Sequence, residues 1–170
     1  MNLKVPTMKY ILMMSLLLLA LRAQTATAAR DFKNILEATE QMLAGRTFEG
    51  EDGVVLSFSK FSFEKPHEPS MQVEISSPGG NSKSHKEIIR KDGDQVVVDE
   101  IQQGSIVNSF LASVEEPYHV LRIRPLDETN SELISRECFL QTNESIHICY
   151  FKFRTNNAVF VTVFREIPHS

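Results

Sequence analysis

Beyond Gly45, the chain is a series of short runs in which apolar and polar residues alternate, and turn-forming residues separate one run from the next. In the run MQVEIS, for example, Met71, Val73 and Ile75 share one parity, whereas the polar residues share the other. A period of two places the apolar side chains on one face of a β-strand. Stretches rich in Gly, Pro and Ser, such as SPGGNSKS, then form turns. The pattern predicts about eight to ten short strands.

Two positions within these runs predict local geometry. Asp92 and Gly93 separate two strand-like runs, and an Asp-Gly pair readily adopts the positive φ angles of a type I′ hairpin turn. In the run GVVLSFSKFSF, the apolar parity changes between Phe58 and Phe61, which predicts a β-bulge near Ser59 and Lys60.

The segment RDFKNILEATEQMLAG carries a helical period instead. Its apolar residues recur three, four and seven positions apart, and Gly45 stands where such a helix would end. The polar face carries acidic residues without a basic cluster, which argues against binding flat on a membrane. We therefore expect this helix to pack on the protein's own sheet. The apolar stripe comprises Phe32, Ile35, Leu36, Met42 and Leu43.

The last two runs, SIHICYFKF and AVFVTVF, are apolar in both parities. Strands that are covered on both faces have this composition, so we expect a central hairpin with the core on one face and the helix on the other. Together the elements predict a mainly β fold of the α+β class. One N-terminal amphipathic helix precedes an antiparallel meander of about 8–10 strands, which forms a barrel, a half-barrel or a sandwich. Periodicity alone does not choose among these three.

Residues 1–28 have the pattern of a secretory signal peptide. Lys4 and Lys9 precede the apolar run YILMMSLLLLAL, and small residues follow it. This run of about a dozen residues is short for a bilayer span, which requires about 20. We expect residues 1–28 to be removed, which leaves residues 29–170 as one secreted, extracellular, β-rich domain without a membrane anchor.

The expected mature domain is acidic. Removing Lys4, Lys9 and Arg22, which are the only charged residues of the leader, leaves 15 of the 18 basic residues against 22 acidic ones, a balance of −7. Nucleic acids and anionic membranes are bound by clustered Lys and Arg, and the basic residues here are scattered. The charge pattern therefore argues against a nucleic-acid partner.

The only two cysteines, Cys138 and Cys149, lie on either side of the polar stretch TNES. Their midpoint falls between Asn143 and Glu144, so a four-residue loop over residues 142–145 places them opposite each other across a hairpin. In a non-hydrogen-bonded pair the Cα atoms approach to about 4.5 Å, which lies within disulfide range. A two-residue loop would place them on the wider type of pair instead. Because a secreted chain reaches an oxidising compartment, we predict a structural disulfide.

The hairpin tip also carries the tripeptide Asn143-Glu144-Ser145, which is an N-glycosylation acceptor. No other Asn in the chain has the required Ser or Thr two residues further on. In a secreted eukaryotic protein, an exposed acceptor of this kind is a site for glycan attachment, so we predict a glycan at Asn143.

We find no motif for catalysis, metal binding or a cofactor. The five histidines form no H-x-x-x-H pair, and the two thiols with His147 supply at most three of the four ligands that zinc takes. Neither a G-x-G-x-x-G sequence nor a Walker loop is present. The acidic residues of DGDQVVVDE lack the EF-hand order, and a solvated hairpin explains them. We therefore predict a non-enzymatic protein without a metal or cofactor.

Arg122 and Arg124 share one face of a predicted strand. Two arginines on one face are able to grip the carboxylate of a ligand or of an acidic partner. Acidic residues are plentiful on the other predicted strands, so we expect these arginines to form cross-strand ion pairs instead.

The sequence leaves two functions open. A Phe-rich interior can enclose a small apolar ligand, as in a carrier, whereas a solid core suits a factor that binds an extracellular protein, such as an inhibitor, immune modulator or signalling ligand. The meander after a leading segment is similar to secreted small-ligand carriers, but the Gly-x-Trp signature of lipocalins is absent because the chain has no Trp. A connected apolar pocket larger than about 300 Å³ would favour the carrier. The candidate interior residues are Phe58, Phe61, Phe63, Phe151, Phe153, Phe160 and Phe164.

Overall fold

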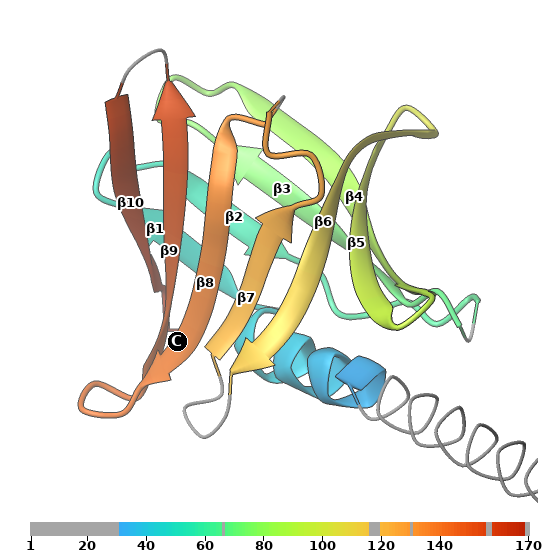
Figure 1. The fold of residues 1–170 in the computed structure, drawn as a ribbon. Helices are drawn as coiled ribbons and strands as arrows, with labels where there is room; N and C mark the ends of the chain where they lie inside the picture. The colour runs from blue at the N-terminus through green and yellow to red at the C-terminus, as the bar shows by residue number, and fades with distance from the viewer. Residues whose placement is uncertain (1–30, 66, 116–119, 130, 156–157, 169–170) are drawn as a thin grey trace, which may run out of the picture.

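The structure, a computed structural model, describes residues 31–65, 67–115, 120–129, 131–155 and 158–168, so the predicted signal peptide lies outside the described residues. Ten antiparallel strands follow one another as a meander, and the first pairs with the last to close the sheet into a barrel (Figure 1). Closure selects the barrel among the three predicted architectures. The strands are β1 (Thr47–Gly50), β2 (Val55–Phe58), β3 (Ser70–Ser76), β4 (Ser82–Asp92), β5 (Gln95–Gln102), β6 (Ser105–Glu115), β7 (Val120–Pro125), β8 (Leu133–Gln141), β9 (Ile146–Thr155) and β10 (Ala158–Glu166).

The barrel closes where β1 meets β10. Phe48 on β1 lies opposite Glu166 on β10, and the backbone N–H of Ile167 donates to the carbonyl of Thr47 at 2.8 Å. The side chain of Phe48 is fully buried, and its ring meets that of Phe58 edge-on, with 5.8 Å between centroids. Burying this large side chain at the seam stabilises closure, and closure pairs the edges that an open sheet would expose.

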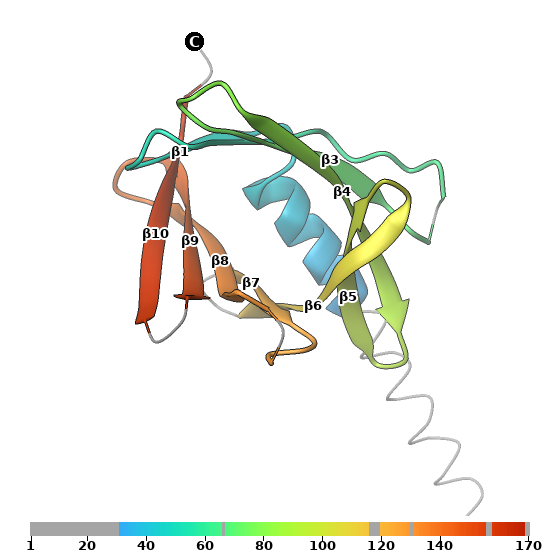
Figure 2. The ribbon, with the colours of Figure 1, turned by 90° about the horizontal axis from the view of Figure 1, so that it is seen from above.

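The N-terminal helix covers one end of the barrel. Within the described chain it runs over residues 31–42, lies at the lower end of the strands in Figure 1, and crosses the ring of strands when seen from above in Figure 2. Ile35 and Met42 are buried in the main core, and the Lys91 ammonium of β4 lies 5.6 Å from the Phe32 ring centroid. The expected location on the outer face of the last two strands is therefore wrong. A closed barrel buries its interior face, and the helix supplies apolar surface at the end of that interior.

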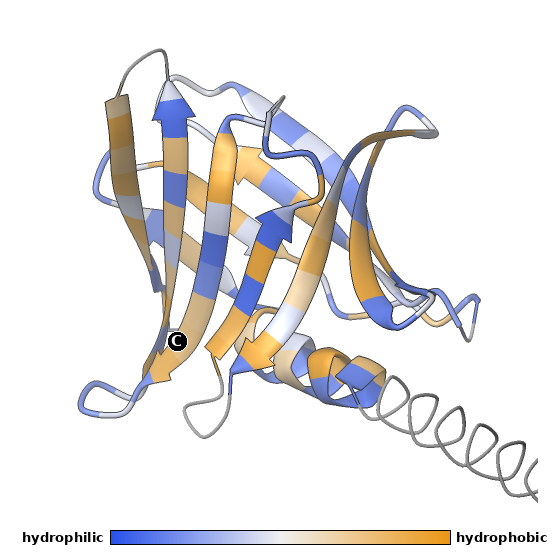
Figure 3. Ribbon diagram, viewed as in Figure 1, coloured by the Kyte–Doolittle hydropathy of each residue, from blue (hydrophilic) through white to orange (hydrophobic). Residues whose placement is uncertain are grey.

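The outer face of β10 is exposed rather than covered. Val159 and Val161 are 55% and 54% exposed, and Figure 3 shows apolar colouring along most of this strand. The expectation of two covered faces is wrong for β10, because only the side chains of the opposite parity enter the barrel. The expected central position in the sheet is confirmed, since β9 pairs with β8 and β10, and β10 pairs with β9 and β1.

The hairpin between β8 and β9 has the predicted register. Gln141 pairs with Ile146, so residues 142–145 form a four-residue loop. Cys138 lies directly opposite Cys149 with 4.2 Å between their Cα atoms, and the two side chains form a disulfide. The predicted bridge is confirmed, and it joins neighbouring strands of the barrel wall.

Of two other local predictions, the turn needs correction and the bulge is confirmed. Asp92 pairs with Gln95, which confirms the hairpin but makes Gly93 and Asp94 the turn residues. Gly93 has a φ of 59°, whereas Asp94 is not among the residues with positive φ, so the turn needs only one left-handed residue and is of the II′ kind. The predicted bulge is present. Pairing with β3 continues past the end of β2, since Phe58 lies opposite Val73 and Ser62 exchanges two backbone hydrogen bonds with Ser70. Residues 59–61 thus face only residues 71 and 72 of β3, and the one extra residue accounts for the change of parity.

Candidate functional site

The interior of the barrel holds a cavity of about 780 Å³ that is open to solvent. Its lining includes Asp52 in the β1–β2 connection and Ser131 and Glu132 in the β7–β8 connection, which lie at the opposite end of the barrel from the helix. Ten of its 19 lining residues are apolar, and five of those ten are Phe. The molecule is therefore a cup, covered at one end by the helix and hollow toward the other.

Four of the seven predicted interior phenylalanines line this cavity, and they come from β9 and β10. Phe151 and Phe153 of β9 lie 6.1 Å apart between ring centroids. Phe164 meets Phe151 at 5.1 Å, and Phe160 stacks on Phe153 at 5.4 Å. Phe160 stays 44% exposed near the open end. These contacts hold the rings as one aromatic wall.

The other three predicted phenylalanines lie elsewhere. Phe58 is 4% exposed and belongs to the packed core, and Phe61 is partly buried against that core. Phe63 is 58% exposed, so the expectation that it faces the interior is wrong. It follows the end of β2, where strand alternation no longer determines which way a side chain points. Phe110 of β6 was not among the predicted interior residues, but it also lines the cavity.

A buried ion pair between Arg136 and Glu87 crosses the interior of the barrel. The Arg136 guanidinium of β8 donates from Nη1 and Nη2 to the two carboxylate oxygens of Glu87 on β4, at 2.7 and 3.0 Å. The two strands are not neighbours in the barrel, so the pair crosses its interior. Burial alone would raise the pKa of Glu87, but attraction to Arg136 and hydrogen bonds from His85 and Arg136 lower it from 4.5 to about 2. The pair is therefore ionised at neutral pH.

The ring of Phe58 lies against the same guanidinium, 5.7 Å from its centroid to Cζ of Arg136. Arg136 Nε is buried and has no hydrogen-bond partner. An arginine that is held bidentately by a carboxylate and faces an aromatic ring is fixed in place. The Arg136 side chain is thus a rigid part of the cavity wall.

A second carboxylate, Glu100 of β5, faces the cavity beside this pair. His85 lies between the two acids, with Nε2 3.5 Å from Glu87 and Nδ1 3.8 Å from Glu100. Glu100 accepts hydrogen bonds from the side-chain amides of Gln102 and Asn108, both at 2.8 Å. These neutral donors orient the carboxylate without balancing its charge.

This polar cluster was not predicted from the sequence. Arg136 and Glu87 are 49 residues apart, and no local motif connects them. The expectation that the acids near the β4–β5 hairpin are solvated is wrong for two of them: Glu100 lines the cavity, and Asp99 is 3% exposed. Asp99 accepts a hydrogen bond from Arg90 Nε at 2.5 Å on the other side of the same sheet. Strand parity was the signal available, because an acid at an inward position must be paired or face a cavity.

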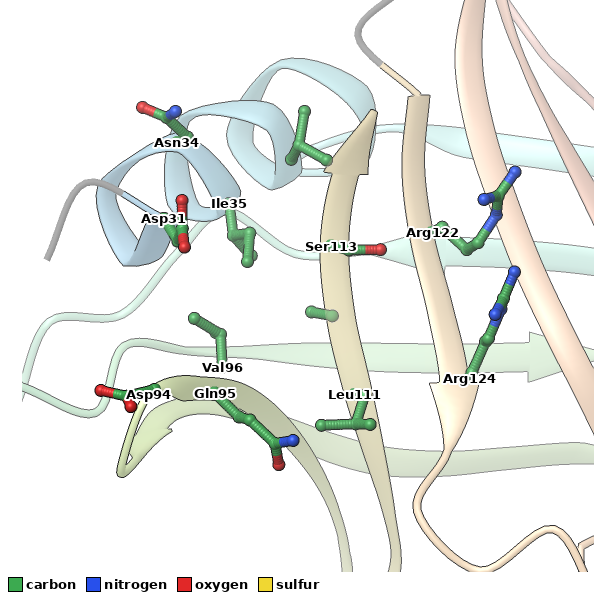
Figure 4. Close-up of a pocket in the computed structure, with 12 residues that line it drawn as sticks. Asp31, Asn34, Ile35, Asp94, Gln95, Val96, Leu111, Ser113, Arg122 and Arg124 are labelled. Carbon is green, nitrogen blue, oxygen red and sulfur yellow. The ribbon is translucent and has the colours of Figure 1, made fainter. Parts of the chain in front are cut away.

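A separate cleft of about 540 Å³ lies between the helix, the β4–β5 hairpin and β6 (Figure 4). Its lining includes Arg122 and Arg124, but Figure 4 shows both side chains directed away from the helix and hairpin. Arg122 donates to Glu137 at 2.8 Å and pairs with Glu115 at 3.0 Å, so the expected cross-strand ion pairs are present for this residue. The cleft therefore lacks a convergent anion-binding pair.

A partly buried carboxylate, Glu166, lies at the end of the barrel near the helix. Glu166 contacts Arg46 Nη1 at 2.5 Å, accepts a hydrogen bond from the backbone N–H of His147 at 3.0 Å, and pairs with Nδ1 of the same histidine at 2.7 Å. Burial alone would raise the pKa of Glu166, but these hydrogen bonds and the Arg46 charge lower it. The cluster ties Arg46, which directly precedes β1, to β9 and β10, and it lies outside the cavity lining, which indicates a structural role.

Asn143 is exposed in the β8–β9 loop, where a glycan would not disturb the barrel. Among the described residues, no group of three His, Cys, Asp or Glu side chains is placed to hold a metal ion. Over the same ranges, no helix combines the length and apolar character needed to span a bilayer.

Comparisons with protein-family models, with curated proteins and with solved structures found no match.

Proposed function

We propose that this protein is a secreted, non-enzymatic carrier that holds a small apolar ligand inside its barrel. The cavity of about 780 Å³ is the observation that carries the proposal. Ligand pockets typically measure about 300–1,000 Å³ and are lined by apolar and aromatic side chains with a few polar groups. The five phenylalanines of the lining surround this space rather than fill it. A packed core would leave few voids larger than a water molecule.

Secretion is supported by two features. The N-terminal residues have the basic, apolar and small-residue regions of a signal peptide, and the disulfide between Cys138 and Cys149 suits an oxidising compartment. The exposed acceptor Asn143 is compatible with passage through a glycosylating pathway. Together these features support an extracellular place of action.

A protein-binding factor is the alternative, and the outer face of β10 favours it. Val159 and Val161 are more than half exposed on neighbouring outward positions of this strand. Exposed apolar residues that gather on one surface often mark a partner site. The carrier remains the first proposal because the alternative predicts a solid interior.

Native mass spectrometry of the secreted protein, before and after organic extraction, tests the carrier. Thr162 faces the cavity from β10, so Thr162→Trp would fill part of it, whereas Val161→Trp places the same ring on the outer face as a matched control. We expect an extractable mass on the wild type and on Val161→Trp, and its loss from Thr162→Trp. No extractable mass on the wild type, or equal occupancy of both variants, would contradict the proposal.

A further inference from the structure

We propose that the ligand is a cationic amphiphile, namely an alkyl or aromatic amine whose ammonium group binds beside Glu100 and whose apolar body lies along the phenylalanine wall. This inference rests on the proposed carrier function and specifies the ligand class of the same cavity. It follows from the charges of the wall, which an apolar ligand alone would not require.

Carboxylates outnumber cations in the cavity lining. Four acids, Asp52, Glu87, Glu100 and Glu132, line it, and Arg136 is the only Lys or Arg among the lining residues. Even with His85 protonated, four carboxylates face two cations. The space enclosed by the barrel therefore carries a negative potential, which low-dielectric walls strengthen.

The one arginine is not available to an anionic ligand. Both terminal nitrogens of Arg136 already donate to Glu87, and the remaining Nε is buried beyond the reach of solvent. An incoming carboxylate would have to displace Glu87 and leave that acid charged and unpaired within the barrel. Breaking a buried pair in this way is strongly unfavourable. A fatty-acid head group therefore has no free cation in the interior.

Glu100 is the interior carboxylate best placed to bind an ammonium group. Its side chain is 15% exposed, and its hydrogen bonds come from the neutral amides of Gln102 and Asn108. His85 Nδ1, at 3.8 Å, is beyond ordinary hydrogen-bond distance. A charged acceptor with oriented oxygens and only neutral donors is suited to a charge-assisted hydrogen bond from a ligand N–H.

The aromatic wall suits the same ligand. Phe110 contributes a ring from β6, which pairs with β5, the strand of Glu100. Phe151, Phe153 and Phe160 extend the wall toward the open end. Ring faces attract cations and provide apolar surface for an alkyl or aromatic body. An amine thus gains from both parts of the cavity, whereas a neutral ligand gains from one.

The mouth adds long-range attraction for a cation. Asp52 and Glu132 are exposed at the open end, and neither has an ion-pair partner among the residues that the structure describes. Acidic residues around an entrance raise the local concentration of cationic ligands and lose this effect at high salt. Among the charged residues that line the cavity, those at the entrance therefore have the same sign as Glu100.

Binding of dodecylamine, dodecanol and dodecanoate to the delipidated protein, measured by displacement of a neutral fluorescent apolar probe, tests the inference. These three ligands share one chain length and differ in the charge of the head group. We expect dodecylamine to bind about tenfold more tightly than dodecanol, which corresponds to about 1.4 kcal/mol, and dodecanoate to bind most weakly. Glu100→Gln should remove the preference for the amine while dodecanol binding stays within twofold.

Glu74→Gln is the matched control, since Glu74 is exposed on β3 and does not line the cavity. This variant should keep the wild-type order of affinities. Equal or tighter binding of dodecanol or dodecanoate would overturn the amine assignment and leave the carrier proposal intact. An amine preference that survives in Glu100→Gln would overturn the binding site named here. Binding of none of the three ligands would overturn the amine assignment and the carrier proposal together.

Discussion

Replacing Glu87 by Gln should destabilise the barrel by about 3 kcal/mol at neutral pH. The magnitude follows from the pKa of Glu87, which falls from 4.5 in the unfolded chain to about 2 in the barrel, because each pH unit corresponds to about 1.4 kcal/mol. The value agrees with the general cost of removing one partner of a buried ion pair, which is about 3–5 kcal/mol. The variant keeps the shape of the side chain but leaves the charge of Arg136, whose side chain is 8% exposed, without its counter-ion.

The pH dependence provides the sharper test. Because the folded-state pKa of Glu87 is lowered, the stabilisation is fully present above about pH 4.5 and is lost as the pH falls toward 2. The difference in unfolding free energy between wild type and Glu87→Gln should therefore close over that interval. Urea unfolding followed by far-ultraviolet circular dichroism measures it, since the chain has no Trp for fluorescence. Glu74→Gln, at an exposed position, should stay within about 0.5 kcal/mol of the wild type.

Two results would contradict an ionised pair between Glu87 and Arg136. One is an unfolding free energy of Glu87→Gln that lies within about 1 kcal/mol of the wild-type value at pH 7. Surface substitutions commonly change this free energy by about 0.5 kcal/mol, so an effect this small would not indicate a buried ion pair. The other is a difference that persists unchanged below a pH of about 2, where the wild-type Glu87 is protonated and no longer differs in charge from its replacement. Either would mean that Arg136 and Glu87 do not form the ionised pair described here.

The remaining predictions concern the disulfide, the partly buried Glu166 and the hairpin tip. Replacing both Cys138 and Cys149 by Ser should lower the unfolding free energy by about 3 kcal/mol, as expected for a loop of this length, and an unchanged urea midpoint would contradict it. Glu166→Gln should lose less stability than the wild type on acidification. The pKa of Glu166 is lowered in the folded protein, so the stabilisation by its carboxylate disappears as the pH falls through that pKa. Unfolding free energies of wild type and variant that fall in parallel with pH would contradict this. Asn143→Gln should remove the glycan mass of the secreted protein without changing its urea midpoint, and an unchanged mass would show that the acceptor is not used.

The strands and the disulfide were predictable because they depend on local order along the chain. Alternation in MQVEIS places Met71 and Val73 inside the barrel, where both are 2% exposed. The register of Cys138 and Cys149 follows from counting outward from a four-residue loop, and neighbouring strands in a meander pair in that way. These predictions needed no knowledge of which distant strands meet.

Closure and the polar interior were not predictable on the same grounds. The pairing of Phe48 with Glu166 joins the two ends of the sheet, and nothing local to either strand specifies it. Arg136 lies next to Glu137, which is on the outer side and pairs with Arg122, so charge alone did not distinguish the inward residue from the outward one. Phe63 was misplaced for the related reason that its segment is no longer a strand.

The position of a bound ligand is the most direct test of a hollow barrel. Backbone and methyl chemical shifts recorded by NMR during titration with dodecylamine would locate it. We expect the changes to concentrate at cavity-lining positions such as Phe151, Phe153 and Thr162, and to spare the outward Val159 and Val161. Changes confined to the outer face of β10, with the cavity-lining residues unaffected, would contradict this expectation.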